Sequence, residues 1–283
     1  MLILTVVNPF ILALVVPQPA RWTFKCDAPP LLTYPHRCGS LSLSERTPSP
    51  RVPSAFVPTA NHIWLQQAGI MWIAAAFLGP ICDGRHSSHD VLHYATDSIA
   101  GAPWLLRAPG SELVLLETCW WVPVAFGGAG VILGAAHPLL DRAWSGGPRA
   151  PPGWPVVLVS IVCFVATYDL SGQLAQQAAA RGPPHDWLSL DLPLLMCAVA
   201  TFLVFERSPG GLLMMGLLAV IGPVAEVGLI NALHLYSYTE ADVAGIPSWI
   251  TWVYAAGGPA NGALGRQVLH ELTIRDGDGA EEQ

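Results

Sequence analysis

The sequence predicts an all-α membrane protein in which six transmembrane helices form one bundle. Two observations point to this fold class. Charged residues make up 12% of the 283 residues and apolar residues 52%, whereas soluble domains carry about 25% charged residues. The apolar residues also gather in six stretches of about the length needed to cross a bilayer. The net charge of -7, without a basic cluster, gives no indication of a nucleic-acid partner.

The segment before the first stretch, residues 1–61, is predicted to be a flexible tail. Its residues 17–61 include nine prolines and five Lys or Arg but only two acids, and such a composition buries too little apolar surface to fold. Residues 1–16 are apolar, yet they lack a basic start and are interrupted by Asn8 and Pro9. We interpret them either as a targeting segment or as a gene-model artefact.

The first predicted span is Ile63–Gly79, and a long polar connection, residues 81–112, follows it. Side chains that can bind metals recur in this connection at steps of three and four residues: Cys82, His86, His89 and His93. On a helix this spacing would bring them to one face, where they could bind zinc. The segment also contains Gly84 and adjacent serines, which favour a solvated loop. We therefore predict a loop here and assign no metal site.

The second predicted span is Thr118–Asp141. Three of its glycines occur at positions i, i+3 and i+7 and lie on one helix face: Gly127, Gly130 and Gly134. Such a face lets a neighbouring backbone approach closely in a bilayer. Trp120 and Trp121 suit the membrane interface. Pro138 lacks an N–H group and is expected to end or bend the helix, which places Asp141 at a membrane boundary.

Spans three to five are predicted at three apolar stretches: Trp154–Leu170, Leu188–Phe205 and Gly210–Leu235. Thr167 and Ser171 are four residues apart at the polar end of the third span and share a face. The fifth span contains Glu226 and Asn231, which point roughly 140° apart on a helix and so do not form one site. An ionised carboxylate near the centre of a span costs about 2.5 to 3.5 kcal/mol. Glu226 is therefore expected to be protonated or hydrogen-bonded.

The sixth predicted span is Ser248–Leu269, and we expect the bundle to be organised around it. No charge occurs between Asp242 and Arg266, and this uncharged length would extend roughly 35 Å as a helix, enough to cross a membrane. The span carries a second face of small residues: Gly258, Gly262 and Gly265. The acidic residues 270–283 are predicted to be a disordered tail.

Six spans place both chain ends on the same side of the membrane. Counted by predicted loops, ten Lys and Arg lie on the side of the termini and three on the other. Because cytosolic loops carry the excess of Lys and Arg, we expect both termini to face the cytosol.

Several short motifs resemble a known family when they are read together. They include Trp120-Trp121-Val122-Pro123, Phe205-Glu206-Arg207-Ser208, Tyr236-Ser237-Tyr238-Thr239 and Gly265-Arg266-Gln267. In this order and spacing they resemble the INSIG family, the insulin-induced gene proteins of the endoplasmic reticulum. The resemblance covers about residues 112–268. The chain departs from the family at Tyr168-Asp169-Leu170-Ser171, where members show an NHAS-type sequence, and at Glu226, where they carry glutamine.

The resemblance implies a regulator and not an enzyme. INSIG proteins bind oxysterols, hold the sterol-sensing domain of SCAP so that SREBP stays in the endoplasmic reticulum, and present HMG-CoA reductase for degradation. The oxysterol would be a regulatory ligand, so no cofactor is implied. Under this hypothesis four residues supply polar contacts to the sterol: Thr167, Ser171, Glu226 and Asn231. Partner binding is expected to depend first on Asp141 and then on Trp120, Trp121 and Pro138.

Two other classes of protein stay open on the sequence. A membrane-embedded lipid transporter would use Glu226 as a proton relay. A metal-dependent lipid enzyme would need His86, His89 and His93 to hold a metal ion on the bilayer side, where its substrate lies.

Overall fold

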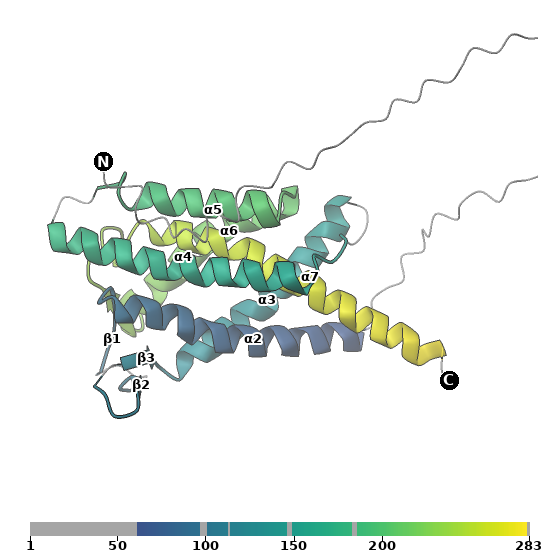
Figure 1. The fold of residues 1–283 in the computed structure, drawn as a ribbon, viewed down its shortest axis with the longest axis horizontal. Coiled ribbons are helices and arrows are strands. Elements are labelled where there is room, and N and C mark those ends of the chain that lie inside the picture. Colours follow the sequence, from purple (N-terminus) through teal and green to yellow (C-terminus); the bar gives the residue numbers. More distant parts are fainter. Residues whose placement is uncertain (1–60, 97–100, 113, 146–148, 183–185, 282–283) are drawn as a thin grey trace, which may run out of the picture. The chain divides into compact units, whose positions relative to one another are not determined.

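The computed structural model describes residues 61–96, 101–112, 114–145, 149–182 and 186–281. The helices in these residues are α2 (Asn61–Ser88), α3 (Trp121–Ser145), α4 (Trp154–Arg181), α5 (Asp191–Phe205), α6 (Pro209–Asn231) and α7 (Ile250–Glu281). The predicted six-helix bundle is confirmed (Figure 1). Four of the helices, α2, α3, α4 and α6, are long and apolar enough to cross a membrane, and α5 is a shorter apolar helix. Of the tail predicted at residues 1–61, all but Asn61 lies outside the described residues, and Asn61 is the first residue of α2.

Helix α7 is the centre of the bundle, because it contacts each of the other five helices. Its alanines at these contacts are buried: Ala255, Ala256, Ala260 and Ala263. A helix that is covered by protein does not need large lipid-facing side chains, which explains why this span is rich in Gly and Ala. Figure 1 shows the C-terminal part of α7 extending past the ends of the neighbouring helices.

The glycines predicted to form packing faces lie at contacts between helices. A side-chain carbon added to Gly130 would lie 2.8 Å from the Met71 carbonyl oxygen of α2. One added to Gly265 would lie 2.5 Å from the Gly134 carbonyl oxygen of α3. Neighbouring side chains come equally near to Gly127, Gly134 and Gly262. Gly258 is in ordinary contact with α6. The backbone of α3 therefore packs directly on both α2 and α7.

The sequence predicted that Pro138 ends or bends helix α3. The helix does not end there but continues to Ser145. A proline at this position leaves the Gly134 carbonyl without its usual N–H donor. The buried Gln67 of α2 supplies a donor instead, because its Nε2 lies 3.0 Å from the Gly134 oxygen and 2.9 Å from the Gly265 oxygen. This side chain compensates for the proline and links three helices.

The connection after α2 differs from the predicted loop. Helix α2 continues to Ser88, so the first part of this segment is helical. Two short antiparallel strand pairs follow. Strand β1 (Leu92–Tyr94) pairs with β4 (Tyr236–Tyr238), and β2 (Trp104–Arg107) pairs with β3 (Val114–Thr118). The first pair joins the connection after α2 to the turn after α6, two segments far apart in the sequence.

The disordered tail predicted at residues 270–283 is wrong for the part that the structure describes, because α7 extends to Glu281. Glu271 accepts a hydrogen bond from Gln267, one turn earlier, at 2.8 Å. It also accepts one from the Trp154 indole of α4 at 3.1 Å. These bonds tie the first turn beyond the predicted span to the bundle, so the helix continues.

Candidate functional site

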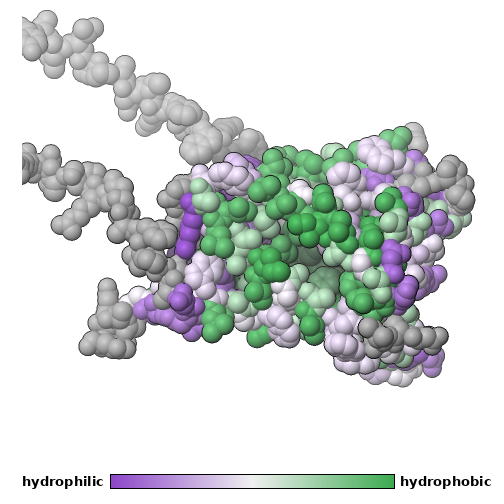
Figure 2. Space-filling view, turned by 180° about the vertical axis from the view of Figure 1, so that it is seen from behind, coloured by the Kyte–Doolittle hydropathy of each residue, from purple (hydrophilic) through white to green (hydrophobic). Residues whose placement is uncertain are grey.

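A cavity of about 330 Å³ lies within the bundle. Its walls come from α2, α3, α4, α6 and α7, and strands β1 and β4 add side chains. Its volume is in the range of small-molecule pockets. Ile132 of α3 and Ile221 of α6 line the cavity and are also 68% and 58% exposed, so the cavity opens between these helices. Figure 2, seen from behind relative to Figure 1, shows a largely hydrophobic face with a hollow in it.

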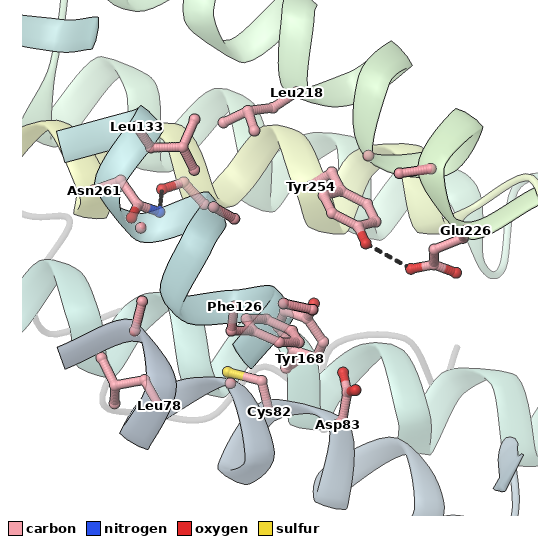
Figure 3. A pocket seen from close by; sticks show the side chains of 18 of the residues that line it. Leu78, Cys82, Asp83, Phe126, Leu133, Tyr168, Leu218, Glu226, Tyr254 and Asn261 are labelled. Carbon is pink, nitrogen blue, oxygen red and sulfur yellow. Dashed lines mark hydrogen bonds between the residues drawn. The ribbon is translucent and has the colours of Figure 1, made fainter. Parts of the chain in front are cut away.

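The carboxylates of the cavity gather at one end (Figure 3). Asp83 projects from α2 and Glu226 from α6 toward the same space. The Tyr254 hydroxyl of α7 donates a hydrogen bond to Glu226 Oε1 at 2.7 Å. Asn261 lies away from this end, and its Nδ2 donates to the Gly257 carbonyl at 2.9 Å. The cavity thus combines a long apolar part with one acidic end.

Aromatic side chains complete the acidic end, and the sequence had not indicated them as ligand contacts. Tyr236 and Tyr238 of β4 line the cavity. Burial, and then the nearby Glu226 carboxylate, raise the pKa of both tyrosine hydroxyls. The Trp121 ring stacks on Tyr236, with centroids 5.8 Å apart and planes at 16°. Alternate residues of a strand point to one face, so the YSYT motif, if taken as a strand, would have predicted that Tyr236 and Tyr238 face the same side.

Of the four predicted sterol contacts, Glu226 alone lines the cavity. The hydroxyls of Thr167 and Ser171 donate to carbonyl oxygens of the preceding turn of α4, at 2.9 and 2.7 Å. Asn231 Nδ2 donates to the Ala244 carbonyl at 2.8 Å and holds the loop after β4. The structure therefore gives these three residues bonds within the protein and not a place in the cavity wall.

The three histidines after the first span have separate partners. His86 is bound by Ser171 at 2.7 Å, His89 by Asp169 at 3.0 Å and His93 by Thr239 at 2.7 Å. Across the part of the chain that the structure describes, no three His, Cys, Asp or Glu side chains form a group suited to a metal ion. His86 is buried, and its bond to α4 explains why α2 continues to Ser88 where a loop was predicted.

An ion cluster of Asp141, Arg149, Glu206 and Arg266 joins α3, α7 and the end of α5. Arg266 Nε lies 2.5 Å from Asp141 Oδ2, and its Nη1 lies 2.6 Å from Glu206 Oε2. Arg149 Nη1 binds Glu206 Oε1 at 2.7 Å. Burial favours the neutral carboxyl, but the hydrogen bonds and charge of Arg266 hold the pKa of Glu206 below its ordinary value. Buried charges are tolerated when they are paired, and here two acids meet two arginines.

The residues predicted to bind a partner lie in different environments. Trp120 is 51% exposed, whereas Trp121 faces the cavity. Pro138 and Asp141 are buried. The Asp141 side chain is 2% exposed and bound to Arg266, so its carboxylate belongs to the ion cluster and is not presented on the outer surface.

The fold and the cavity define the class: a multi-pass helical membrane protein whose bundle encloses a pocket of small-molecule size. No family model matches the chain. The chain is 23% identical to the insulin-induced gene 2 protein of Xenopus tropicalis over 226 residues, which cover 80% of this chain and 93% of that protein. It is 22% identical to the insulin-induced gene 1 protein of Homo sapiens over 219 residues, which cover 77% and 71%.

A solved structure shares the fold. The mycobacterial Insig homologue MvINS from Mycobacterium vanbaalenii matches with a TM-score of 0.57 at 19% identity, over 72% of this chain and 94% of that one. The sequence matches and the common fold confirm the resemblance that the motifs predicted. The chain is a multi-pass membrane protein that is similar to INSIG proteins in sequence and in fold.

Proposed function

We propose that the chain is a sterol-responsive regulator of sterol and isoprenoid synthesis in the endoplasmic reticulum membrane, without enzymatic activity of its own. It binds an oxysterol or a related lipid in the cavity. One observation carries this proposal: the cavity of about 330 Å³ is apolar along most of its length and acidic at one end, inside an INSIG-like bundle. A sterol needs such an apolar slot with one or two polar groups for its hydroxyls.

The proposed partners are membrane proteins with a sterol-sensing domain, namely a SCAP-like protein that retains SREBP, HMG-CoA reductase, or both. The cavity residues Ile132 and Ile221 also form part of the outer surface. A ligand between α3 and α6 would therefore contribute to the surface that a partner helix contacts. Ligand binding and partner binding then strengthen each other, which is positive coupling between two binding events.

In this proposal both chain ends face the cytosol. The alternating direction of six helices then puts the ion cluster near the cytosolic side and the acidic end of the cavity nearer the lumen. The excess of Lys and Arg on the side of the termini supports this orientation. Accessibility labelling of single cysteines placed near each end of the cysteine-free chain tests it, and labels on opposite sides of the membrane would refute it.

Ligand binding is tested with the purified full chain and a photoactivatable oxysterol. We expect labelling of residues between α3 and α6 that unlabelled oxysterol reduces. Leu133→Trp, which fills the cavity lining, should abolish the labelling. Ile73→Trp is the matched control because Ile73 is 67% exposed and lies outside the lining. Labelling that unlabelled sterol does not reduce, or that survives in Leu133→Trp, would contradict the proposal.

Partner capture is tested separately in cells. We expect tagged full-length protein to retain SCAP or HMG-CoA reductase more strongly when oxysterol is present. Asp141→Ala should abolish capture while the protein stays inserted, because the ion cluster that orients α3 against α7 is broken. Equal capture with and without oxysterol would discard the sensing role and leave the fold unaffected.

A further inference from the structure

Two buried polar atoms in the cavity wall have no hydrogen-bond partner among the described residues: Glu226 Oε2 and Trp121 Nε1. Glu226 is 5% exposed, and its other oxygen, Oε1, already accepts from Tyr254. A buried polar atom without a partner costs about 1 to 3 kcal/mol. Native proteins pair more than nine in ten of their buried polar groups, so these two atoms indicate what the cavity binds.

Both residues adjoin Tyr236 in the cavity wall. Tyr236 connects them, because its ring stacks on Trp121 and its hydroxyl lies near the Glu226 carboxylate, which helps to raise the pKa of Tyr236. Figure 3 shows that Asp83 faces this space from α2. No Lys or Arg lines the cavity in the described part of the chain.

The two atoms have opposite needs. When Glu226 is ionised, its Oε2 only accepts hydrogen bonds, whereas the indole Nε1 only donates one. A ketone or an ester can only accept, so it would leave Oε2 without a donor. An ammonium group can only donate, so it would leave Nε1 without an acceptor. An alcohol satisfies both atoms, because its O–H donates and its lone pairs accept.

We propose that the acidic end of the cavity selects an alcohol group of its lipid ligand, which donates to Glu226 Oε2 and accepts from Trp121 Nε1. This inference rests on the proposed function, because it assumes that the cavity holds an amphiphile. It adds the chemical class of the headgroup and the two atoms that recognise it.

The same argument predicts what a glutamine would do in place of Glu226. The amide of a glutamine can donate as well as accept, so it would pair with a ketone as readily as with an alcohol. Glutamate makes the site stricter, since a ketone beside Glu226 leaves the carboxylate unpaired. A discrimination of about tenfold between alcohol and ketone corresponds to about 1.4 kcal/mol and is within the range for one unpaired buried group.

The test is a competition against the photoactivatable oxysterol, with purified full-length protein in detergent micelles. The competitors are an oxysterol diol and two relatives in which either the ring hydroxyl or the side-chain hydroxyl is oxidised or replaced by a ketone. We expect one of the two ketones to compete about tenfold more weakly than the diol. In Glu226→Gln the same ketone should come within about twofold of the diol. Glu240→Gln is the matched control because Glu240 is exposed and outside this cavity.

The outcomes separate this inference from the proposed function. If both ketones compete as well as the diol in the wild-type protein, the headgroup inference is overturned while sterol binding stands. If the weak ketone stays equally weak in Glu226→Gln, Glu226 is not the selecting group and the inference is also overturned. If no sterol reduces the labelling, the proposed function fails and the inference fails with it.

Discussion

Arg266→Met should destabilise the bundle more than the same change at the surface. Methionine keeps much of the apolar stem of arginine but removes the ion pairs to Asp141 and Glu206. Glu206 keeps Arg149, whereas Asp141, whose side chain is 2% exposed, keeps no cation among the pairs seen in the structure. Removing one partner of a buried ion pair costs about 3 to 5 kcal/mol. We expect a loss of that size in the free energy of unfolding.

The assay is unfolding of the purified full-length chain in mild detergent, with SDS titrated in and helix content followed by circular dichroism. Arg181→Met is the matched control, because Arg181 is exposed at the end of α4. A surface change of this kind should alter the free energy of unfolding by no more than about 0.5 kcal/mol. The difference between the two variants then measures what burial adds.

A double variant separates the lost charge pair from lost packing. Asp141→Asn combined with Arg266→Met removes the charge that the single change leaves unpaired. It should recover about 1 to 3 kcal/mol relative to Arg266→Met alone, in the range of coupling energies for residues in contact. If Arg266→Met is as stable as the control, or if the double variant recovers nothing, an unpaired buried charge is not what sets the loss.

Three further predictions concern packing and pH. Gly265→Val should destabilise the bundle by about 1 to 3 kcal/mol, because a side-chain carbon there would lie 2.5 Å from the Gly134 carbonyl oxygen. The control is Gly216→Ala, whose added carbon meets open space. Equal SDS midpoints for the two variants would contradict the close packing. Gln67→Leu should lower the free energy of unfolding by about 1 to 3 kcal/mol in the same titration, because the Gly134 and Gly265 carbonyls lose their side-chain donor. An unchanged midpoint would show that the compensation for Pro138 is not needed. Because the pKa of Glu206 is lowered in the folded protein, its ionised form should add stability that is fully present above the ordinary pKa of 4.5 and is lost as the pH falls through the lowered pKa. SDS midpoints measured across acid pH should show this loss in the wild type and less of it in Glu206→Gln. Parallel curves for the two proteins would refute the assignment.

The number of helices and their approximate positions could be predicted because they depend on local composition. A long run of apolar residues favours a membrane helix whatever lies next to it, and small residues spaced at i, i+3 and i+7 share a helix face wherever the helix lies. Errors occurred where a distant residue changed a local preference. Helix α3 passes Pro138 because Gln67 donates to the Gly134 carbonyl, and α2 reaches Ser88 while His86 is bound to Ser171.

The candidate site was predicted in part. Glu226 was identified because a carboxylate inside an apolar span is costly without a partner. Thr167, Ser171 and Asn231 are also polar residues at or near predicted spans, but nothing in the sequence shows whether a polar group faces a cavity or a carbonyl of its own helix. Asp83 and Trp121 were missed as cavity residues because their neighbours across the cavity lie on other helices.

The sequence by itself determined that this chain forms a bundle of six helices typical of a membrane protein and that it resembles INSIG proteins, because both depend on composition and on the order of short motifs. Only the tertiary structure decided which polar residues meet. It brought Asp141 of α3, Glu206 at the end of α5 and Arg266 of α7 together and set Glu226 opposite Asp83 across a cavity. Such pairings depend on the rotation and crossing of whole helices, which are set by packing between residues far apart in the chain.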